Sequence, residues 1–422
     1  MKLQKILNRI QKLHPKEIDL SLNRIKKLCK KLGNPQENLK CISIVGTNGK
    51  YSTIQALRAI LKQANINCNI YTSPHLQKIN ERFVFNNREI SDKNLSKLLN
   101  EVEEVNNGDS ITYFEILTAA FFYNAKKFNK NINLIESGLF HRFDATNILK
   151  KNLASIVTSI GLDHLDWLPK NERSIKKIVT EKTSSLLNSK IIISRQNSKE
   201  TLNIIKKNII KNNSKKIIFN EHFTCSENKN GFIYYEDEFG GLKLPKPNIL
   251  GEFQIDNIAS AIATARSLNL KIRDQNIKHG ITKIKSIGRL QEIKNGKIKN
   301  LCKNNKLFVD GSHNPLGANV LKKYLKSLNC GKHIILGMML NKDHLEYMSY
   351  FKYEVDTITT IDIKNQPNSI KGYDLKNKLE GFNNVTYKKN IKEAINSLNL
   401  KKNDIILVTG SLYLVGEVLS LN

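Results

Sequence analysis

The sequence contains no uninterrupted run of about 18 apolar residues, so no segment is typical of a membrane-spanning helix. Its first twenty residues, MKLQKILNRIQKLHPKEIDL, also lack the continuous apolar stretch of a secretory signal, because polar residues interrupt the apolar ones every few positions. This spacing predicts an amphipathic helix. We therefore expect a cytoplasmic protein with no membrane partner.

Cysteine is scarce, and no two cysteines form a C-x-x-C pair. The six cysteines are scattered over the chain at Cys29, Cys41, Cys68, Cys225, Cys302 and Cys330. This spacing argues against a thiolate metal centre and against a disulfide framework. A reducing compartment fits best.

Acidic residues are few, with 38 Asp and Glu against 68 Lys and Arg, which gives a formal net charge of +30. An excess of this size is one signature of nucleic-acid binding. However, the lysines are mixed with asparagine and isoleucine in stretches such as IIKKNIIKNNSKKII (204–218), which is typical of a compositional bias. We expect no nucleic-acid partner, although a positive field would favour acidic, multiply charged substrates.

The 422 residues, 40% of them hydrophobic, are enough for two or three domains. Short apolar runs alternate with amphipathic stretches such as 52–64, which predicts an α/β fold. The predicted strands lie in the runs 41–46, 131–137, 153–164, 189–194, 215–220, 305–315, 332–340, 355–363 and 403–413. The pattern restarts around 280–290, so we expect a larger domain over 1–287 and a smaller Rossmann-like domain over 288–422. The glycine-containing segment 231–248 is typical of a hairpin.

The stretch SIVGTNGKYST (43–53) is similar to a nucleotide-binding loop but departs from the Walker A pattern G-x-x-x-x-G-K-[ST]. Ile44 stands where that pattern has its first glycine, and Tyr51 stands where it has the hydroxyl. A strand, a glycine loop and a helix nevertheless direct backbone N–H groups toward one point. Lys50 adds a positive charge, and Ser52 and Thr53 add hydroxyls. A chance glycine turn is the alternative interpretation.

Acidic and histidine side chains follow several of the predicted strands, where open α/β sheets bind their ligands. Glu136 closes one apolar run, and Asp163-His164 closes another. Asp310 and His313 lie in VDGSHNP (309–315). Oxygen ligands with one imidazole are compatible with Mg²⁺. Each residue alone could equally be a surface acid, a helix cap or a solvated histidine.

An ordered set of motifs makes the chain resemble the dihydrofolate synthase/folylpolyglutamate synthase family of the Mur ligase superfamily. From residue 46 to 417 these are GTNGK-x-S, YTSPHL, ERFVFNNREI, TYFEILTA, DATN, TSIGLDH, GRLQ, DGSHNP, NKD and GSLYLVGE. The family's loop is G-T-N-G-K-x-[ST], with its hydroxyl one position later than in Walker A. The resemblance implies a P-loop-containing Mur ligase-like domain followed by the Rossmann-like domain.

The resemblance also implies an ATP-dependent ligase that activates a carboxylate as an acyl phosphate and joins it to the amine of L-glutamate. It assigns the triphosphate to Thr47, Asn48, Gly49, Lys50 and Ser52, and further ATP contacts to Asn257, Arg289 and Asp310. It assigns Mg²⁺ to Ser73, Glu136 and His164, and catalytic roles to Lys50, Lys182 and His313. One or two Mg²⁺ ions are implied, the second held through a carbamylated Lys182.

Two further segments bear on the acceptor substrate. The segment LHPKEIDLSLNRI (13–25) resembles the part of the bifunctional enzymes that contacts the pterin ring. The resemblance implies a dihydropteroate pocket lined by Asp19, Leu20, Ser21, Leu22, Thr112, Tyr113, Phe114, Phe143, Asp144 and Ala145. A flat pteridine suits aromatic neighbours. For Phe121 and Phe122 we favour a place in the core. We expect dihydropteroate, reduced folates and L-glutamate as partners, and a monomer.

Three departures from the family pattern stand out. Tyr51 replaces a usual glycine, and Phe140 and His141 replace two glycines in ESGLFHRFDATN. If these positions need a positive φ, a side chain there is costly. EKTSSL, which contains Lys182, also lacks the family's small turn. The alternatives are therefore a degenerate paralogue with weak or narrowed activity, and a basic ATP-binding protein associated with RNA. A cell-wall Mur ligase fits the substrate motifs less well.

Overall fold

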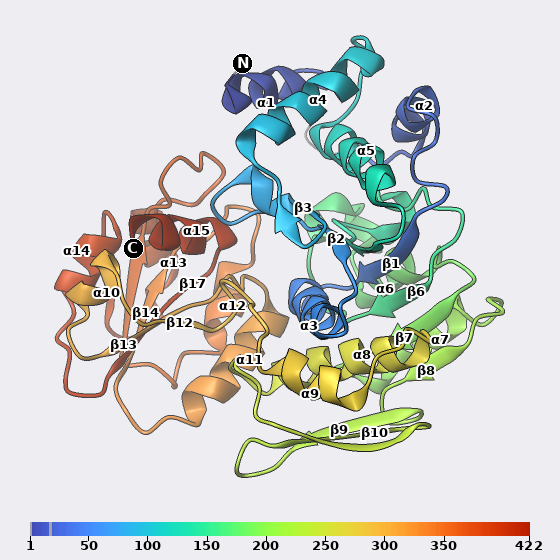
Figure 1. The fold of residues 1–422 in the computed structure, drawn as a ribbon. Helices are drawn as coiled ribbons and strands as arrows, with labels where there is room; N and C mark the ends of the chain where they lie inside the picture. The colour runs from blue at the N-terminus through green and yellow to red at the C-terminus, as the bar shows by residue number, and fades with distance from the viewer. Residues whose placement is uncertain (1, 17–18) are drawn as a thin grey trace. The chain divides into compact units, whose positions relative to one another are not determined.

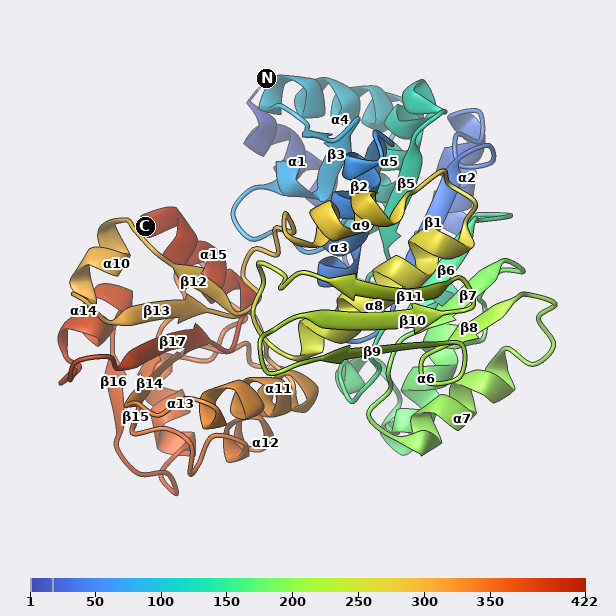
Figure 2. The same ribbon diagram turned by 60° about the horizontal axis from the view of Figure 1, so that its bottom comes forward.

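The computed structural model describes residues 2–16 and 19–422, so two residues of the segment 13–25 lie outside the described part. The chain forms two compact units, drawn in Figures 1 and 2. Unit 1 comprises residues 1–160, 168–248 and 255–284. Unit 2 comprises 161–167, 249–254 and 285–422. The short segment 161–167, which contains Asp163 and His164, therefore groups with the C-terminal part of the chain.

Unit 1 is built on an eight-stranded sheet in the order β4-β3-β2-β5-β1-β6-β7-β8. Its strands are β1 (Lys40–Val45), β2 (Cys68–Tyr71), β3 (Phe83–Phe85), β4 (Arg88–Glu89), β5 (Ile132–Glu136), β6 (Ala154–Val157), β7 (Lys190–Ile193) and β8 (Lys216–Ile218). Six neighbouring strands of the sheet are parallel, namely β2, β5, β1, β6, β7 and β8. At the β2 edge, β3 pairs antiparallel with β2 and β4 pairs antiparallel with β3. The five strands expected in this part of the sequence are confirmed. The sequence interpretation missed β2, β3 and β4, which are only two to four residues long.

Two helices leave the sheet on opposite sides. Helix α3 (Lys50–Gln63) carries the chain from β1 past β5 to β2, and α5 (Tyr113–Ala125) leads back to β5. Because parallel crossovers are right-handed, this reversal of direction places α3 and α5 on opposite faces. Helix α9 (Asp274–Ile281) packs against α3. The adjacent strand ends of β1, β2 and β5 therefore lie where the direction of winding changes, which is the usual ligand position in such sheets.

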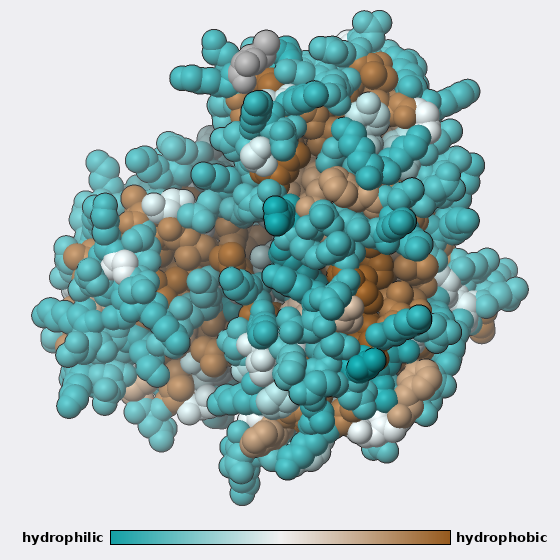
Figure 3. All heavy atoms as spheres, viewed as in Figure 1, coloured by the Kyte–Doolittle hydropathy of each residue, from teal (hydrophilic) through white to brown (hydrophobic). Residues whose placement is uncertain are grey.

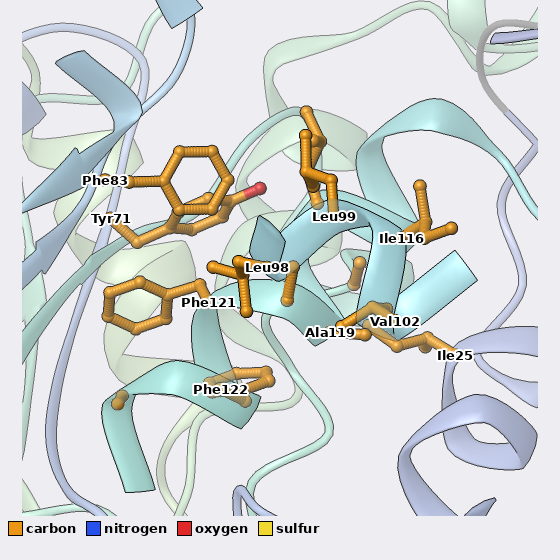
Figure 4. Close-up of a cluster of buried hydrophobic side chains, with 14 of the residues drawn as sticks. Ile25, Tyr71, Phe83, Leu98, Leu99, Val102, Ile116, Ala119, Phe121 and Phe122 are labelled. Carbon is orange, nitrogen blue, oxygen red and sulfur yellow. The ribbon is translucent and has the colours of Figure 1, made fainter. Parts of the chain in front are cut away.

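The N-terminal helices bury a large apolar cluster together with α5. Helices α1 (Leu3–Gln11), α2 (Asn23–Lys31) and α4 (Asp92–Asn106) all contribute to it. Figure 4 shows the rings of Phe121 and Phe122 within a cluster of aromatic and aliphatic side chains, and both residues are 0% exposed. Their predicted place in the core is confirmed.

The remaining elements of unit 1 extend the sheet and cover it. They are α6 (Ile175–Thr183), α7 (Lys199–Asn208), α8 (Phe253–Ser267), and a separate antiparallel sheet of β9 (Phe223–Glu227), β10 (Ile233–Asp237) and β11 (Gly240–Leu244). Strands β10 and β11 are the hairpin expected within 231–248. Along β10 buried and exposed residues alternate, because this sheet has one apolar face.

Unit 2 contains a six-stranded sheet in the order β12-β13-β17-β14-β15-β16. The four expected strands are present as β13 (Lys306–Val309), β14 (Lys332–Leu336), β15 (Thr357–Ile361) and β17 (Ile405–Thr409). The sheet is wider than expected, because β12 (Gln291–Ile293) and β16 (Val385–Lys388) add to its edges. Both edge strands carry polar residues, which hid them in the sequence. The helices are α10 (Lys297–Leu301), α11 (Pro315–Lys326), α12 (His344–Ser349), α13 (Gly372–Lys378), α14 (Ile391–Asn396) and α15 (Leu412–Leu421).

Hydrophilic residues cover most of the face drawn in Figure 3, with apolar residues interspersed among them. Among the helices of residues 2–16 and 19–422, none is long and apolar enough to cross a membrane.

The contact between α9 and α3 depends on a glycine. A Cβ atom at Gly280 would lie 2.8 Å from the Cα atom and 2.9 Å from the backbone nitrogen of Ile60. Backbone atoms cannot move aside as a flexible side chain can, so Gly280→Ala should force the two helices apart. We expect this change to lower the free energy of unfolding by about 1–3 kcal/mol, as overpacking does.

Gly381→Ala is the matched control, because a Cβ atom there meets nothing within 4 Å. Thermal unfolding followed by circular dichroism and calorimetry measures both variants. Equal melting temperatures for the two would contradict the close α9–α3 packing.

Candidate functional site

The backbone of the loop between β1 and α3 has two positions at which only glycine fits. Gly46 has φ +149° and Gly49 has φ +88°, both in the region that favours glycine. A Cβ atom at Gly46 would lie 2.0 Å from Oγ1 of Thr158, and one at Gly49 would lie 2.3 Å from Oδ1 of Asn257. The predicted strand, glycine loop and helix are therefore present, and Asn257 of α8 packs directly on the loop.

Two backbone N–H groups of the loop form hydrogen bonds to the segment that follows β6. Those of Thr47 and Asn48 donate to the carbonyl oxygen of Ser159, at 2.9 and 3.1 Å. Both N–H groups therefore point at one acceptor, which lies just after the end of β6. The Nζ atom of Lys50 donates to the carbonyl oxygens of Gly46 and Thr47, at 3.2 and 3.1 Å. The lysine charge thus lies over the loop itself.

The start of α3 accommodates both the hydroxyl residues and the unexpected tyrosine. Ser52 and Thr53 are buried in its first turn, and Oγ1 of Thr53 donates to Oδ1 of Asn257 at 3.4 Å. Tyr51 has helical backbone geometry and is half-buried. A side chain is allowed in that geometry, so the departure from glycine at Tyr51 does not strain the loop.

Glu136 lies beside Lys50 at the ends of neighbouring strands. Its Oε1 atom is 3.9 Å from the Nζ atom of Lys50, and its Oε2 atom accepts a hydrogen bond from the backbone nitrogen of Ser73 at 3.2 Å. A carboxylate and a serine hydroxyl are hard oxygen ligands that suit Mg²⁺. Within the described residues no group of three or more His, Cys, Asp or Glu side chains could hold a metal ion. An ion here would therefore take most of its remaining ligands from water and from phosphate.

The third expected metal ligand, His164, belongs to unit 2 and adjoins a buried acid. Asp163 accepts hydrogen bonds from Nζ of Lys342 at 2.7 Å and from Nδ2 of Asn314 at 2.9 Å. Its carboxylate is also 3.6 Å from Nε2 of His313. Burial opposes ionisation, but His164, His313 and Lys342 outweigh it and hold the pKa of Asp163 well below its usual range. The sequence analysis noted Lys342 only as part of the NKD motif.

The other expected nucleotide residues of unit 2 surround the end of β13. Asp310 accepts hydrogen bonds from the backbone nitrogens of Leu290 and Ser312, at 2.7 and 2.8 Å. Burial raises the pKa of Asp310, although the charge of Arg289 opposes this rise. The Nδ1 atom of His313 donates to the carbonyl oxygen of Gly311 at 2.9 Å, which directs its Nε2 atom toward Asp163.

An arginine that the sequence analysis did not single out connects two parts of the expected acceptor pocket. Arg24 donates from NH1 to Oδ2 of Asp19 at 2.7 Å and from Nε to Oε2 of Glu115 at 2.9 Å. Glu115 in turn accepts from the backbone nitrogen and the hydroxyl of Thr112, both at 2.8 Å, and so caps α5. Asp19 and Thr112, far apart in sequence, are thereby joined in one network. No sequence pattern relates residues so distant.

The other expected pocket residues differ in exposure. Phe114 stacks on Tyr71 with ring centroids 5.9 Å apart, and its ring lies against Gly138. Leu22 and Tyr113 pack against the N-terminal apolar cluster, and Ala145 is buried within it. The most exposed of the set are Leu20 (36%) and Phe143 (37%). Ser21 is half-buried, and its hydroxyl accepts from the backbone nitrogen of Asn23 at 3.2 Å.

Asp144 organises the loop that follows β5. Its carboxylate accepts hydrogen bonds from the backbone nitrogens of Gly138, Leu139 and Thr146, at 2.8, 3.3 and 3.0 Å. Burial raises the pKa of Asp144, and these hydrogen bonds oppose the rise. The side chain expected to touch substrate therefore also holds the loop in shape.

The two bulky residues of that loop fit without backbone strain. Phe140 has φ −121° and ψ 129°, and His141 is not among the residues with positive φ. Both are buried, at 1% and 3% exposure. The cost that a positive φ would impose on these side chains does not arise. Burial, helped by the charge of Lys182, lowers the pKa of His141 to about 4, so its ring is neutral near pH 7.

Lys182 of α6 points at the same loop. Its Nζ atom donates to the carbonyl oxygen of Leu139 at 2.7 Å and lies 5.6 Å from the centroid of the Phe140 ring. A carbonyl oxygen and an aromatic face are both electron-rich and favour an ammonium ion. A carbamate nitrogen would keep one N–H, so the hydrogen bond to Leu139 is compatible with either form of this lysine.

Comparisons with known proteins agree with this arrangement. A family model described as "Mur ligase, glutamate ligase domain" matches residues 288–412. The dihydrofolate synthase/folylpolyglutamate synthase of Bacillus subtilis is 28% identical, over 94% of this chain and 94% of its own length. The structure of E. coli FolC in complex with DHPP and ADP has a TM-score of 0.86 at 26% identity, covering 100% of this chain and 97% of that one.

A third relative shows the same fold at lower identity. The bifunctional folylpolyglutamate synthase/dihydrofolate synthase of Yersinia pestis, complexed with AMPPNP and Mn ion, has a TM-score of 0.87 at 24% identity. It covers 100% of this chain and 98% of its own. The likeness thus extends over both units, from the glycine loop to the end of the chain. The chain is similar to dihydrofolate synthase/folylpolyglutamate synthases over nearly its whole length, carries a Mur ligase glutamate ligase domain at residues 288–412, and is an ATP-dependent ligase.

Proposed function

We propose that this chain adds L-glutamate to dihydropteroate, making dihydrofolate, and to reduced folates, making folylpolyglutamates. The observation that carries the proposal is the approach of Lys50 to Glu136 above a loop that requires glycine at 46 and 49. This pair provides one positive charge for phosphate and one negative charge for a metal ion, side by side. The names of the relatives, together with DHPP and ADP bound to E. coli FolC, support the choice of substrates.

The reaction divides into two steps. A carboxylate oxygen of the acceptor attacks the γ-phosphorus of ATP, the bond from that phosphorus to the bridging oxygen breaks, and ADP leaves. The glutamate nitrogen then attacks the carbonyl carbon of the acyl phosphate, phosphate leaves, and the amine proton passes to solvent. Both steps depend on positioning and on neutralising charge. Lys50 meets the charge that develops on phosphate, and Thr47, Asn48, Gly49 and Ser52 shape the cradle that holds it.

We further propose that a divalent ion, Mg²⁺ in the cell, is held by Ser73 and Glu136. When bound, it neutralises phosphate charge. Mn bound to the Yersinia pestis enzyme is consistent with a divalent ion in this fold. The residues of unit 2 proposed for the same reaction are Arg289 and Asp310 for ATP, His164 for the metal, and His313 for catalysis.

Asn257 has the most direct support among the proposed ATP contacts of unit 1, because its amide packs on Gly49. A change at Asn257 would alter both its proposed contact with ATP and the shape of the loop. We also propose that the chain acts as a monomer in the cytoplasm, and that its domains divide at residues 287 and 288. These three points rest on the sequence.

Lys50→Ala should reduce ligase turnover by about a hundredfold or more, since it removes a charge that meets the developing phosphate charge. Lys62→Ala, an exposed lysine at the other end of α3, is the control and should have near-normal turnover. Phosphate release with glutamate and acceptor measures both. Normal turnover in a folded Lys50→Ala protein would contradict the role given to the loop.

Glu136→Gln and His164→Ala should each raise the Mg²⁺ concentration needed for half-maximal activity, because each removes a ligand or its charge. Glu89→Gln changes an exposed acid of β4 and should leave the requirement unchanged. Titration of activity with Mg²⁺ at fixed ATP measures the three variants. An unchanged requirement in both test variants would mean that these residues are structural.

Asp19→Ala and Phe114→Ala should lower the specificity constant for dihydropteroate more than that for reduced folates. A selective loss of roughly tenfold corresponds to about 1.4 kcal/mol of lost contact. The KM for ATP should hardly change. Asp109→Ala removes another acid of unit 1 that pairs with a lysine, and it should leave the ratio of the two constants unaltered. A parent protein that extends reduced folates but never uses dihydropteroate would refute the bifunctional proposal and leave the ligase assignment standing.

A further inference from the structure

The glycine loop (46–49) is held on one side by a single peptide group. The backbone nitrogens of Thr47 and Asn48 both donate to the carbonyl oxygen of Ser159, at 2.9 and 3.1 Å. This carbonyl group shares a planar trans peptide with the N–H group of Ile160, and in such a peptide the two groups point in opposite directions. Any contact that fixes the N–H group of Ile160 therefore also fixes the direction of the carbonyl oxygen to which the loop is bonded.

Gln196, which follows β7, makes that contact. Its Oε1 atom accepts a hydrogen bond from the backbone nitrogen of Ile160 at 3.1 Å, and its Nε2 atom donates to the carbonyl oxygen of Thr158 at 3.2 Å. The same Nε2 atom donates to the carbonyl oxygen of Ser194 at 3.0 Å. An N–H group needs the amide oxygen and a carbonyl group needs the amide nitrogen, so these partners determine the orientation of the amide. One side chain thus holds the backbone on both sides of Ser159.

The amide of Gln196 is a stronger support than the ion pair next to it. Arg195 pairs with Asp256 of α8 at 3.0 Å, but the two side chains are 50% and 27% exposed, and exposed ion pairs contribute little. Thr158 and Ile160, by contrast, are buried. Without the amide, a backbone carbonyl group and a backbone N–H group would lose their partner in the interior, which is costly. The position of the Ser159–Ile160 peptide therefore depends mainly on Gln196.

We propose that Gln196 is a positioning residue for nucleotide binding, which acts through the Ser159–Ile160 peptide to hold the glycine loop in the shape that receives the phosphates of ATP. The proposal rests on the function proposed above, in which this loop holds the triphosphate. The expected acceptor pocket has its own supports at Arg24 and Asp144. Loss of the Gln196 amide should therefore weaken the binding of nucleotide and leave the binding of the acceptor almost unchanged.

Hydrogen exchange of the ligand-free full chain, followed by mass spectrometry, tests the positioning independently of activity. Gln196→Met keeps the length of the side chain and loses all of its hydrogen bonds. It should speed exchange about tenfold in the peptides that contain Thr47 and Asn48, because their acceptor is no longer held in place. Gln196→Glu keeps the shape and loses the amide donor, so it should change the exchange in the same direction. Unchanged exchange in both variants would overturn the proposal.

Asn212→Leu is the matched control, because it removes an amide with the same kinds of partner from another part of unit 1. The Nδ2 atom of Asn212 donates to the carbonyl oxygens of Leu186 and Leu187, and its Oδ1 atom accepts from the backbone nitrogen of Ser214. This variant should leave both the exchange of the glycine loop and the affinity for ADP unchanged. An equal effect of Asn212→Leu on the loop would mean that Gln196 acts only through general stability, and would overturn the proposal.

Calorimetric titration of the full chain with ADP and Mg²⁺ measures the effect on nucleotide binding. Gln196→Met should weaken ADP binding about tenfold. In the ligase assay it should raise the KM for ATP and leave the KM for the acceptor almost unchanged. If Lys50→Ala weakened ADP binding and Gln196→Met did not, the positioning role would be overturned. If neither variant weakened it, the proposed phosphate role of the loop would be wrong, and the exchange rates alone would decide whether Gln196 holds the loop.

Discussion

The backbone path through Gly46 and Gly49 is the constraint on which the rest of the site depends. Both residues have positive φ, and at both positions a side-chain carbon would overlap Thr158 or Asn257. This close approach joins the end of β1 to β6 on one side and to α8 on the other. The same path starts α3 at Lys50 and keeps its amine within 3.9 Å of Glu136. Backbone geometry thus holds together Lys50 and Glu136, the cation proposed for phosphate and the anion proposed for the metal ion.

The part of unit 1 that is proposed to bind the acceptor substrate is held together by side-chain contacts between residues far apart in sequence. Arg24 connects the N-terminal segment to the cap of α5, and Lys182 connects α6 to the loop 137–144 that follows β5. Loss of Arg24 would be costly, because it would leave the buried carboxylate of Glu115 without its ion pair. The chemistry of phosphate transfer and the choice of acceptor therefore rest on different supports. That separation explains how Phe140 and His141 can stand in one loop without disturbing the other.

Much of the fold could be predicted from the sequence, because buried parallel strands are apolar runs. Glu136 and Asp310, two of the residues proposed for the site, were singled out because they follow such runs, at the ends of β5 and β13. Strand β2 was missed because it is only four residues long. Strands β12 and β16 were missed because they are edge strands with polar residues, which do not form an apolar run. Sequence reasoning overlooked Arg24 and gave Asp144 only a substrate role, since their partners depend on tertiary packing. The shared acceptor of the Thr47 and Asn48 N–H groups, the carbonyl oxygen of Ser159, also depends on tertiary packing and has no sequence signal.

The most direct test is the stoichiometry of phosphate release by the purified chain. With ATP and Mg²⁺ present, one phosphate should appear for each glutamate joined, with dihydropteroate and, separately, with a reduced folate. Release should fall to background when either glutamate or the acceptor is withheld, because the two steps share one acyl phosphate. Phosphate release that continues at the same rate without acceptor, or glutamate-independent turnover of ATP with no amide product, would contradict the account.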